Sequence, residues 1–296
     1  MAREPRSGRP GLVWAVPALV YFAALALFPM ILVVGLSFCS WNGLGDPQWI
    51  GLGNWRKLAS DPQLGSSLWL SLETGVVTWL VQTAICLPLG VWSAGRQRSR
   101  AVVSTMFFVP LLMSSAAIAL VFSALLDPNF GLAGLLGPWL GVDDGNFIGS
   151  PGLAIWAVMF VITWQFVPFH TLLYQAATRQ IPVVLYEAAT LDGAGRWRQF
   201  FSITVPQLRN SIVTSSVLML VGSLTYFDIV LLLTSGGPGT ATRTLPLHMY
   251  LTGFSSFDMG LGSALATLLL IAGTALSLLV VRVTGFRRMA SVREGL

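Results

Sequence analysis

Six long apolar stretches constrain what this chain can fold into. A helix that crosses a membrane needs about 20 mostly apolar residues, and every one of these stretches is at least that long. Only 10% of the residues are charged, whereas soluble domains carry roughly 25% because their surfaces face water. The pattern therefore predicts an all-α, polytopic membrane protein with six transmembrane helices, at residues 13–38, 68–94, 101–126, 153–178, 210–234 and 259–281.

Basic residues predict the orientation of these helices. If the spans alternate in direction, 14 of the 17 lysines and arginines fall on one side, and an excess of this kind marks the cytoplasmic side. We therefore expect both termini in the cytoplasm, with residues 1–12 and 285–296 as tails and 13–284 as the transmembrane domain. The net charge of +5 follows from the same loops, so it gives no reason to expect nucleic acid as a partner.

Motifs for catalysis are missing from the sequence. The single lysine, Lys57, precedes Leu58, whereas a phosphate-binding Walker A loop needs Gly-Lys-Ser/Thr. The two histidines, His170 and His248, are too far apart for a zinc pair on one helix. We therefore expect no enzyme activity, no metal site and no cofactor bound by this chain.

Acidic residues inside the apolar stretches bear on the source of energy. Glu73 and Asp228 are expected near the outer ends of their helices rather than near the midplane. A transporter driven by protons or ions would need ionisable groups near the middle of the membrane. An ion- or proton-coupled secondary transporter is therefore disfavoured by this pattern and is kept as the alternative function.

The inner segment 179–209 has its own helical pattern. Pro182 suits the first turn of a helix, residues 183–191 contain no helix breaker, and Gly193 suits a C-terminal cap or tight turn. A second short helix is expected over 195–203. A compact helix–turn–helix between two spans indicates a docking surface for another protein.

This segment resembles the EAA loop of ABC importer permeases. The matching residues are Glu187-Ala188-Ala189, then Asp192-Gly193-Ala194, then a Phe-x-x-Ile-x-x-Pro run that ends at Pro206. Outer-loop elements of the maltose-type and glycerol-phosphate-type first permease subunits are also matched, at residues 51–55, 127–131 and 227–239. One departure is Asn210, where many members carry proline.

The resemblance implies the type I ABC importer permease fold, a place in the bacterial inner membrane and carbohydrate import by alternating access. It implies a second, different permease subunit, two ATPase subunits that bind ATP and Mg²⁺, and an extracytoplasmic sugar-binding protein. It also implies that the loop couples this chain to an ATPase through Tyr186, Glu187, Ala188, Ala189, Asp192, Gly193 and Ala194.

A transport path for a sugar needs hydrogen-bonding groups and aromatic faces. Helical spacing places such residues on one face of the fourth span and one face of the fifth, and placement against the maltose-type permeases agrees. The mid-span positions hold no arginine, which favours a neutral mono- or oligosaccharide; a polyol or glycerol phosphate stays open, and the sequence does not name the sugar. The candidate substrate-binding residues are Gln165, Phe166, Phe169, Gly222, Ser223 and Tyr226.

Overall fold

The computed structural model describes residues 12–95 and 107–284. Contacts divide the chain into two compact units, one with residues up to Asp61 plus Met249–Leu268, the other with Pro62–His248 plus the chain from Leu269. The division falls within α15 (Leu245–Tyr250) and α16 (Met259–Thr284).

The first unit begins with an apolar helical stretch. It consists of η1 (Leu12–Ala15), α1 (Val16–Phe22), η2 (Ala23–Leu27) and α2 (Phe28–Leu36). A two-stranded antiparallel hairpin follows, made of β1 (Cys39–Ser40) and β2 (Gln48–Trp49), and then α3 (Gly53–Ala59). Asn54 is fully buried and donates from Nδ2 to the carbonyls of Ser37 and Cys39, at 3.0 and 2.8 Å. This amide therefore ties α3 to the hairpin. The unit also contains η5 (Leu251–Ser255).

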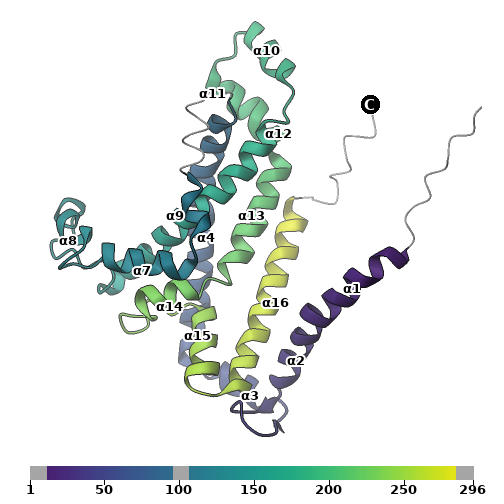
Figure 1. Ribbon diagram of the computed structural model, residues 1–296, viewed down its shortest axis with the longest axis vertical. Coiled ribbons are helices and arrows are strands. Elements are labelled where there is room, and N and C mark those ends of the chain that lie inside the picture. The colour runs from purple at the N-terminus through teal and green to yellow at the C-terminus, as the bar shows by residue number, and fades with distance from the viewer. Residues whose placement is uncertain (1–11, 96–106, 285–296) are drawn as a thin grey trace, which may run out of the picture. The chain divides into compact units, whose positions relative to one another are not determined.

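The core of the second unit is formed by α4 (Pro62–Ser93), α9 (Pro151–Thr178) and α13 (Arg209–Ser223), which lie alongside one another (Figure 1). Cys86, Val167, Tyr174 and Met219 pack together where the three helices meet. α4 and α9 each contain an internal proline, Pro88 and Pro168, which transmembrane helices tolerate because neighbouring groups satisfy the freed backbone.

Small residues allow α4 to approach its neighbours closely. A Cβ added to Gly90 would lie 2.6 Å from Tyr174 Cβ, and one added to Gly75 would lie 2.5 Å from Ser223 Oγ. The buried stripe of α4 is otherwise small or polar, whereas its exposed side carries large apolar residues such as Trp69, Leu72 and Leu80. Small and hydroxyl-bearing residues are typical of helix contacts in membranes.

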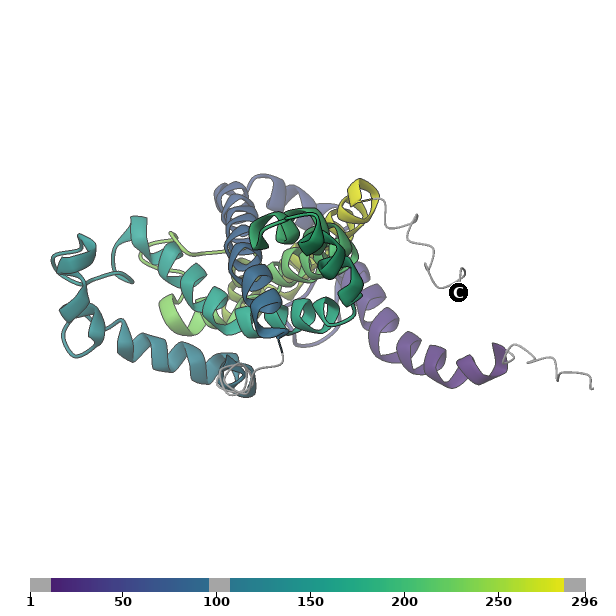
Figure 2. The same ribbon diagram turned by 90° about the horizontal axis from the view of Figure 1, so that it is seen from above.

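Shorter helices surround this core. They are α6 (Val109–Leu112), α7 (Ser115–Leu125), α8 (Leu132–Leu136), η3 (Pro138–Leu140) and α14 (Asp228–Thr234). α7 packs against α14 and α9, and it leads away from the three-helix core toward α8 (Figures 1 and 2). The EAA-like segment, residues 179–209, contains α10 (Val183–Leu191), α11 (Arg196–Gln199), η4 (Phe200–Thr204) and α12 (Val205–Gln207).

The all-α prediction is confirmed, and within residues 12–95 and 107–284 four single helices are long and apolar enough to cross a membrane. They cover Val16–Leu36, Pro62–Ser93, Pro151–Thr178 and Met259–Val283, close to four of the six expected spans.

Neither of the other two expected spans is a single continuous helix in the described residues. The stretch 210–234 is a bent pair, Arg209–Ser223 and Asp228–Thr234, with a 50° angle between the two parts. The stretch 101–126 is described only from residue 107, and there it is divided at Met113–Ser114 into α6 and α7. Ser114 has an extended backbone and accepts from the Ala117 amide, as an N-cap does. The expected single span is therefore not seen in the described part of this stretch.

Candidate functional site

The EAA-like segment connects α9 to α13. It forms a helix–turn–helix beyond the ends of these two helices (Figure 1). α10 covers Val183–Leu191, the range expected from the sequence. Pro182 lies at the N-cap, one position before the first turn. The second helix is α11, continued by a π-helical turn to Thr204 and then by α12, so the helical segment runs beyond the expected 195–203.

Gly193 makes the turn after α10. Its φ of +76° is one that L side chains rarely adopt, and a Cβ added there would meet no atom within 4 Å. The amides of Gly193 and Ala194 donate to the carbonyls of Thr190 and Ala189, at 3.0 and 2.8 Å. Glycine is therefore required here by backbone conformation rather than by lack of space.

The expected coupling residues divide into exposed and internal groups. Glu187, Ala188, Asp192 and Gly193 are exposed, whereas Tyr186, Ala189 and Ala194 are half-buried. The Tyr186 hydroxyl is hydrogen-bonded to Thr204 Oγ1 at 2.9 Å, so it is turned into the segment itself.

Three exposed apolar side chains accompany the EAA motif, and the sequence-based prediction of the site did not include them. Leu191 is 90% exposed, Trp197 78% and Phe201 63%, and the Trp197 ring stacks on Phe201. An exposed aromatic pair of this kind is typical of an interaction surface. The signal was present in the sequence, because three large apolar residues stand in a loop that also carries Arg196 and Arg198.

Three of the six candidate substrate residues come together at the break between α13 and α14. The rings of Phe166 and Tyr226 are stacked, with centroids 4.9 Å apart and an interplanar angle of 23°. A Cβ added to Gly222 would lie 3.2 Å from the Tyr226 hydroxyl. The absence of a side chain at Gly222 therefore leaves room for the Tyr226 hydroxyl.

The other three candidates lie in different surroundings. Gln165 is buried, and its Nε2 donates to Ser115 Oγ at 3.0 Å; its Oε1 is buried without a hydrogen-bond partner among the described residues. Ser223 donates to the Leu220 carbonyl and packs against Gly75.

Phe169, the sixth candidate, is 39% exposed, with its ring edge-on to His170. His170 in turn shares a hydrogen bond with Ser215 Oγ at 2.8 Å. The structure therefore gathers Phe166, Gly222 and Tyr226, and it places Ser223 in helix packing.

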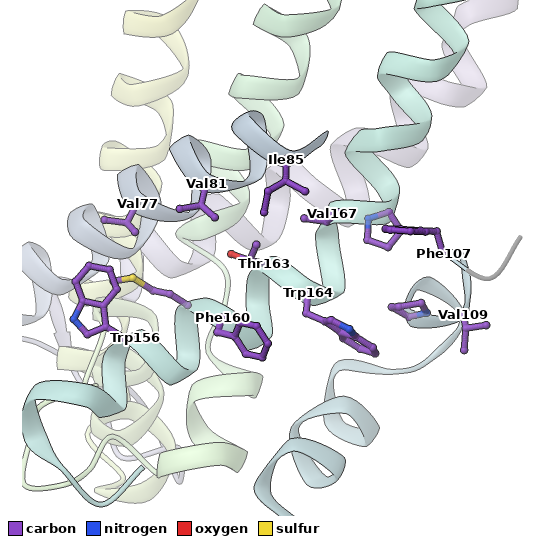
Figure 3. A pocket seen from close by; sticks show the side chains of 13 residues that line it. Val77, Val81, Ile85, Phe107, Val109, Trp156, Phe160, Thr163, Trp164 and Val167 are labelled. Atoms are coloured by element: carbon purple, nitrogen blue, oxygen red, sulfur yellow. The ribbon is translucent and has the colours of Figure 1, made fainter. Parts of the chain in front are cut away.

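A cavity of about 660 Å³ lies between α4, α6 and α9 (Figure 3). Its walls are almost entirely apolar, and Thr163 supplies the one side-chain hydroxyl among the lining residues. A sugar needs several convergent polar groups, so this cavity is unsuited to one, and it shares no residue with the six candidates. The lining residues are Val77, Val81, Ile85, Phe107, Val109, Pro110, Trp156, Met159, Phe160, Thr163, Trp164, Val167 and Pro168.

Comparison with known proteins identifies relatives over nearly the whole chain. The probable ABC transporter permease protein YurN of Bacillus subtilis is 35% identical, over 90% of this chain and 93% of its own. The trehalose/maltose transport system permease protein MalF of Thermococcus litoralis is 27% identical, over 96% of each chain.

A solved structure shares the fold. It is a bacterial alginate ABC transporter in complex with an alginate pentasaccharide-bound periplasmic protein, and one of its chains matches with a TM-score of 0.81 at 21% identity, over 95% of this chain and 96% of that one. A family model also matches residues 86–288. The chain belongs to the family of binding-protein-dependent transport system inner membrane components.

Proposed function

We propose that this chain is the membrane-spanning permease subunit of an ATP-driven carbohydrate importer and contributes half of the translocation path. The observation that carries the proposal is the EAA-like segment, in which Glu187, Ala188 and Asp192 are exposed, as are the apolar Leu191 and Trp197. An ATPase subunit is the expected partner of this surface. The chain itself is non-catalytic in this scheme, and ATP and Mg²⁺ bind to the partner ATPases.

The proposed mechanism is alternating access. Two ATPase subunits close on ATP, displace the EAA-like segments of this chain and of a second, different permease subunit, and change which side of the membrane the path faces. Such coupling is a free energy shared between two sites. It requires the segment to lie on the cytoplasmic side, with both termini also in the cytoplasm, as the distribution of arginines predicts.

Carbohydrate is the proposed substrate class because the Thermococcus relative is named for trehalose and maltose and the solved relative for alginate. Aromatic faces such as the Phe166–Tyr226 pair suit a sugar ring. We propose that Gln165, Phe166, Phe169, Gly222, Ser223 and Tyr226 contribute to the path. An extracytoplasmic binding protein would deliver the sugar, and a ligand screen on that protein would identify it.

The test is the variant Gly193→Asp. We expect it to abolish uptake while the protein still reaches the membrane in normal amount, because the variant adds a negative charge beside Asp192 on the proposed docking surface, in addition to the strain of an L residue at φ +76°. Normal uptake by this variant would reject the coupling role. Sugar uptake by the chain reconstituted without any ATPase would instead favour a secondary transporter.

A further inference from the structure

Four hydrogen bonds form a closed ring inside the EAA-like segment. The Tyr186 hydroxyl bonds Thr204 Oγ1 at 2.9 Å, and Thr204 Oγ1 donates to the Gln199 carbonyl at 3.4 Å. The Gln199 Nε2 donates to Thr190 Oγ1 at 3.1 Å, and Thr190 Oγ1 donates to the Tyr186 carbonyl at 2.7 Å. The ring joins α10 to α11 and η4 across the turn at Gly193.

Gln199 closes the ring on the side of the turn. Its Nε2 also donates to the Ala194 carbonyl at 2.9 Å, so both N–H donors of the amide are used. These two bonds fix α11 to the end of α10 and to the turn itself. Without them, the angle of the turn would depend on the backbone hydrogen bonds of Gly193 and Ala194 and on the Tyr186–Thr204 bond, in a segment whose glycines restrict the backbone least.

Thr204 connects the ring to the fifth span. It is 1% exposed, and its carbonyl accepts from the Leu208 amide at 2.9 Å, while the Leu208 carbonyl accepts from Ile212 at 2.8 Å. The backbone hydrogen bonds therefore continue from Thr204 into α13. A displacement of α10 can pass through the Tyr186–Thr204 bond into this helix.

We propose that Gln199 and Thr204 are positioning residues that hold α10 at a fixed angle to α13, so that movement of α10 shifts α13 instead of flexing the turn. This inference rests on the proposed function, because the ATPase is what would move α10. Networks of hydrogen bonds and rigid helices of this kind carry coupling between distant sites. Gln199 is half-buried and has no role in the expected docking surface.

The test uses the complete transporter, with its ATPases and second permease, in lipid nanodiscs. Amide hydrogen exchange is measured in α10 and in residues 209–215, with and without ATP plus orthovanadate. The wild type should change in both segments. In Gln199→Met and Thr204→Val, we expect the change in α10 to persist and the change in residues 209–215 to fall at least about fivefold, which is the effect of losing one net hydrogen bond, because each variant removes two side-chain hydrogen bonds.

Two matched variants serve as controls. Thr204→Ser keeps the hydroxyl, and Gln207→Met removes an exposed glutamine of the same segment outside the ring; both should behave as wild type. Because Thr204 is buried, Gln199→Met alone decides the matter if Thr204→Val does not assemble. A wild-type response in residues 209–215 of Gln199→Met, or no response there in the wild type, would overturn the proposal.

The proposed function and this inference would be disproved by different results. If Gly193→Asp transports normally, the EAA-like segment does not couple to the ATPase at all. If Gly193→Asp abolishes uptake but Gln199→Met transmits the change to residues 209–215, only the role of the ring is wrong.

Discussion

Replacement of Gly193 by alanine isolates the contribution of backbone conformation to the proposed docking of an ATPase. The residue has φ +76°, and a Cβ added there meets no atom within 4 Å, so the methyl group causes no clash. The cost is that of an L residue in the left-handed region, about 1–2 kcal/mol. That energy corresponds to roughly a 5–30-fold change in the ratio of the native turn to other conformations.

Gly195→Ala is the matched control, two residues further along. Gly195 has φ −69° and ψ 166°, and a Cβ added there also meets nothing within 4 Å. Alanine adopts that conformation without strain, so this variant should leave the turn intact. Both variants add the same single methyl group to an exposed position of the same segment.

The assay is titration of the purified permease pair with the ATPase subunit, in detergent or nanodiscs. If only the native turn docks, the apparent Kd of Gly193→Ala rises by up to roughly 5–30-fold, and that of Gly195→Ala stays at the wild-type value. Equal Kd values for all three proteins would refute the conformational reasoning. Equal weakening by both alanines would indicate that a methyl group obstructs docking sterically.

Two further predictions concern the membrane-spanning region. Gly90→Ala should lower the thermal stability of the detergent-solubilised protein by about 1–3 kcal/mol through overpacking against Tyr174, whereas Gly152→Ala, with nothing within 4 Å of its added Cβ, should not; equal unfolding temperatures would contradict this. Phe166→Ala should weaken sugar uptake more than Tyr226→Phe, which keeps the stacked ring; equal uptake by the two variants would remove the pair from the path.

Local signals made the EAA-like segment predictable. Pro182 precedes α10 and Gly193 follows it, and the helix begins and ends next to these two residues. Such boundaries are predictable because caps and turns depend on neighbouring residues. The ring through Gln199 was not predictable, since it joins residues across a turn whose angle the sequence does not specify.

The break in the fifth span was missed for a different reason. An apolar run indicates that a segment lies in lipid, but it does not indicate where the helix bends. The bend at residues 224–227 accompanies the packing of Tyr226 on Phe166 of another helix, a contact that depends on the tertiary fold. Four of the six expected spans were therefore predictable from hydropathy as single helices, whereas the breaks in the other two and the geometry of the candidate substrate site were not.

The small, polar inner stripe of α4 changes the cost of a polar-to-apolar substitution. In a water-soluble helix bundle, exchanging a buried Ser71 or Thr78 for leucine would remove apolar surface from water, and this gain would offset part of the cost of overpacking. Here the lipid already solvates leucine as well as any neighbouring helix could, so that exchange gains nothing from burial. It would crowd the close contacts of α4 and, at Ser71, leave the Leu245 amide without its acceptor, so substitution scales derived from soluble proteins would underestimate its cost.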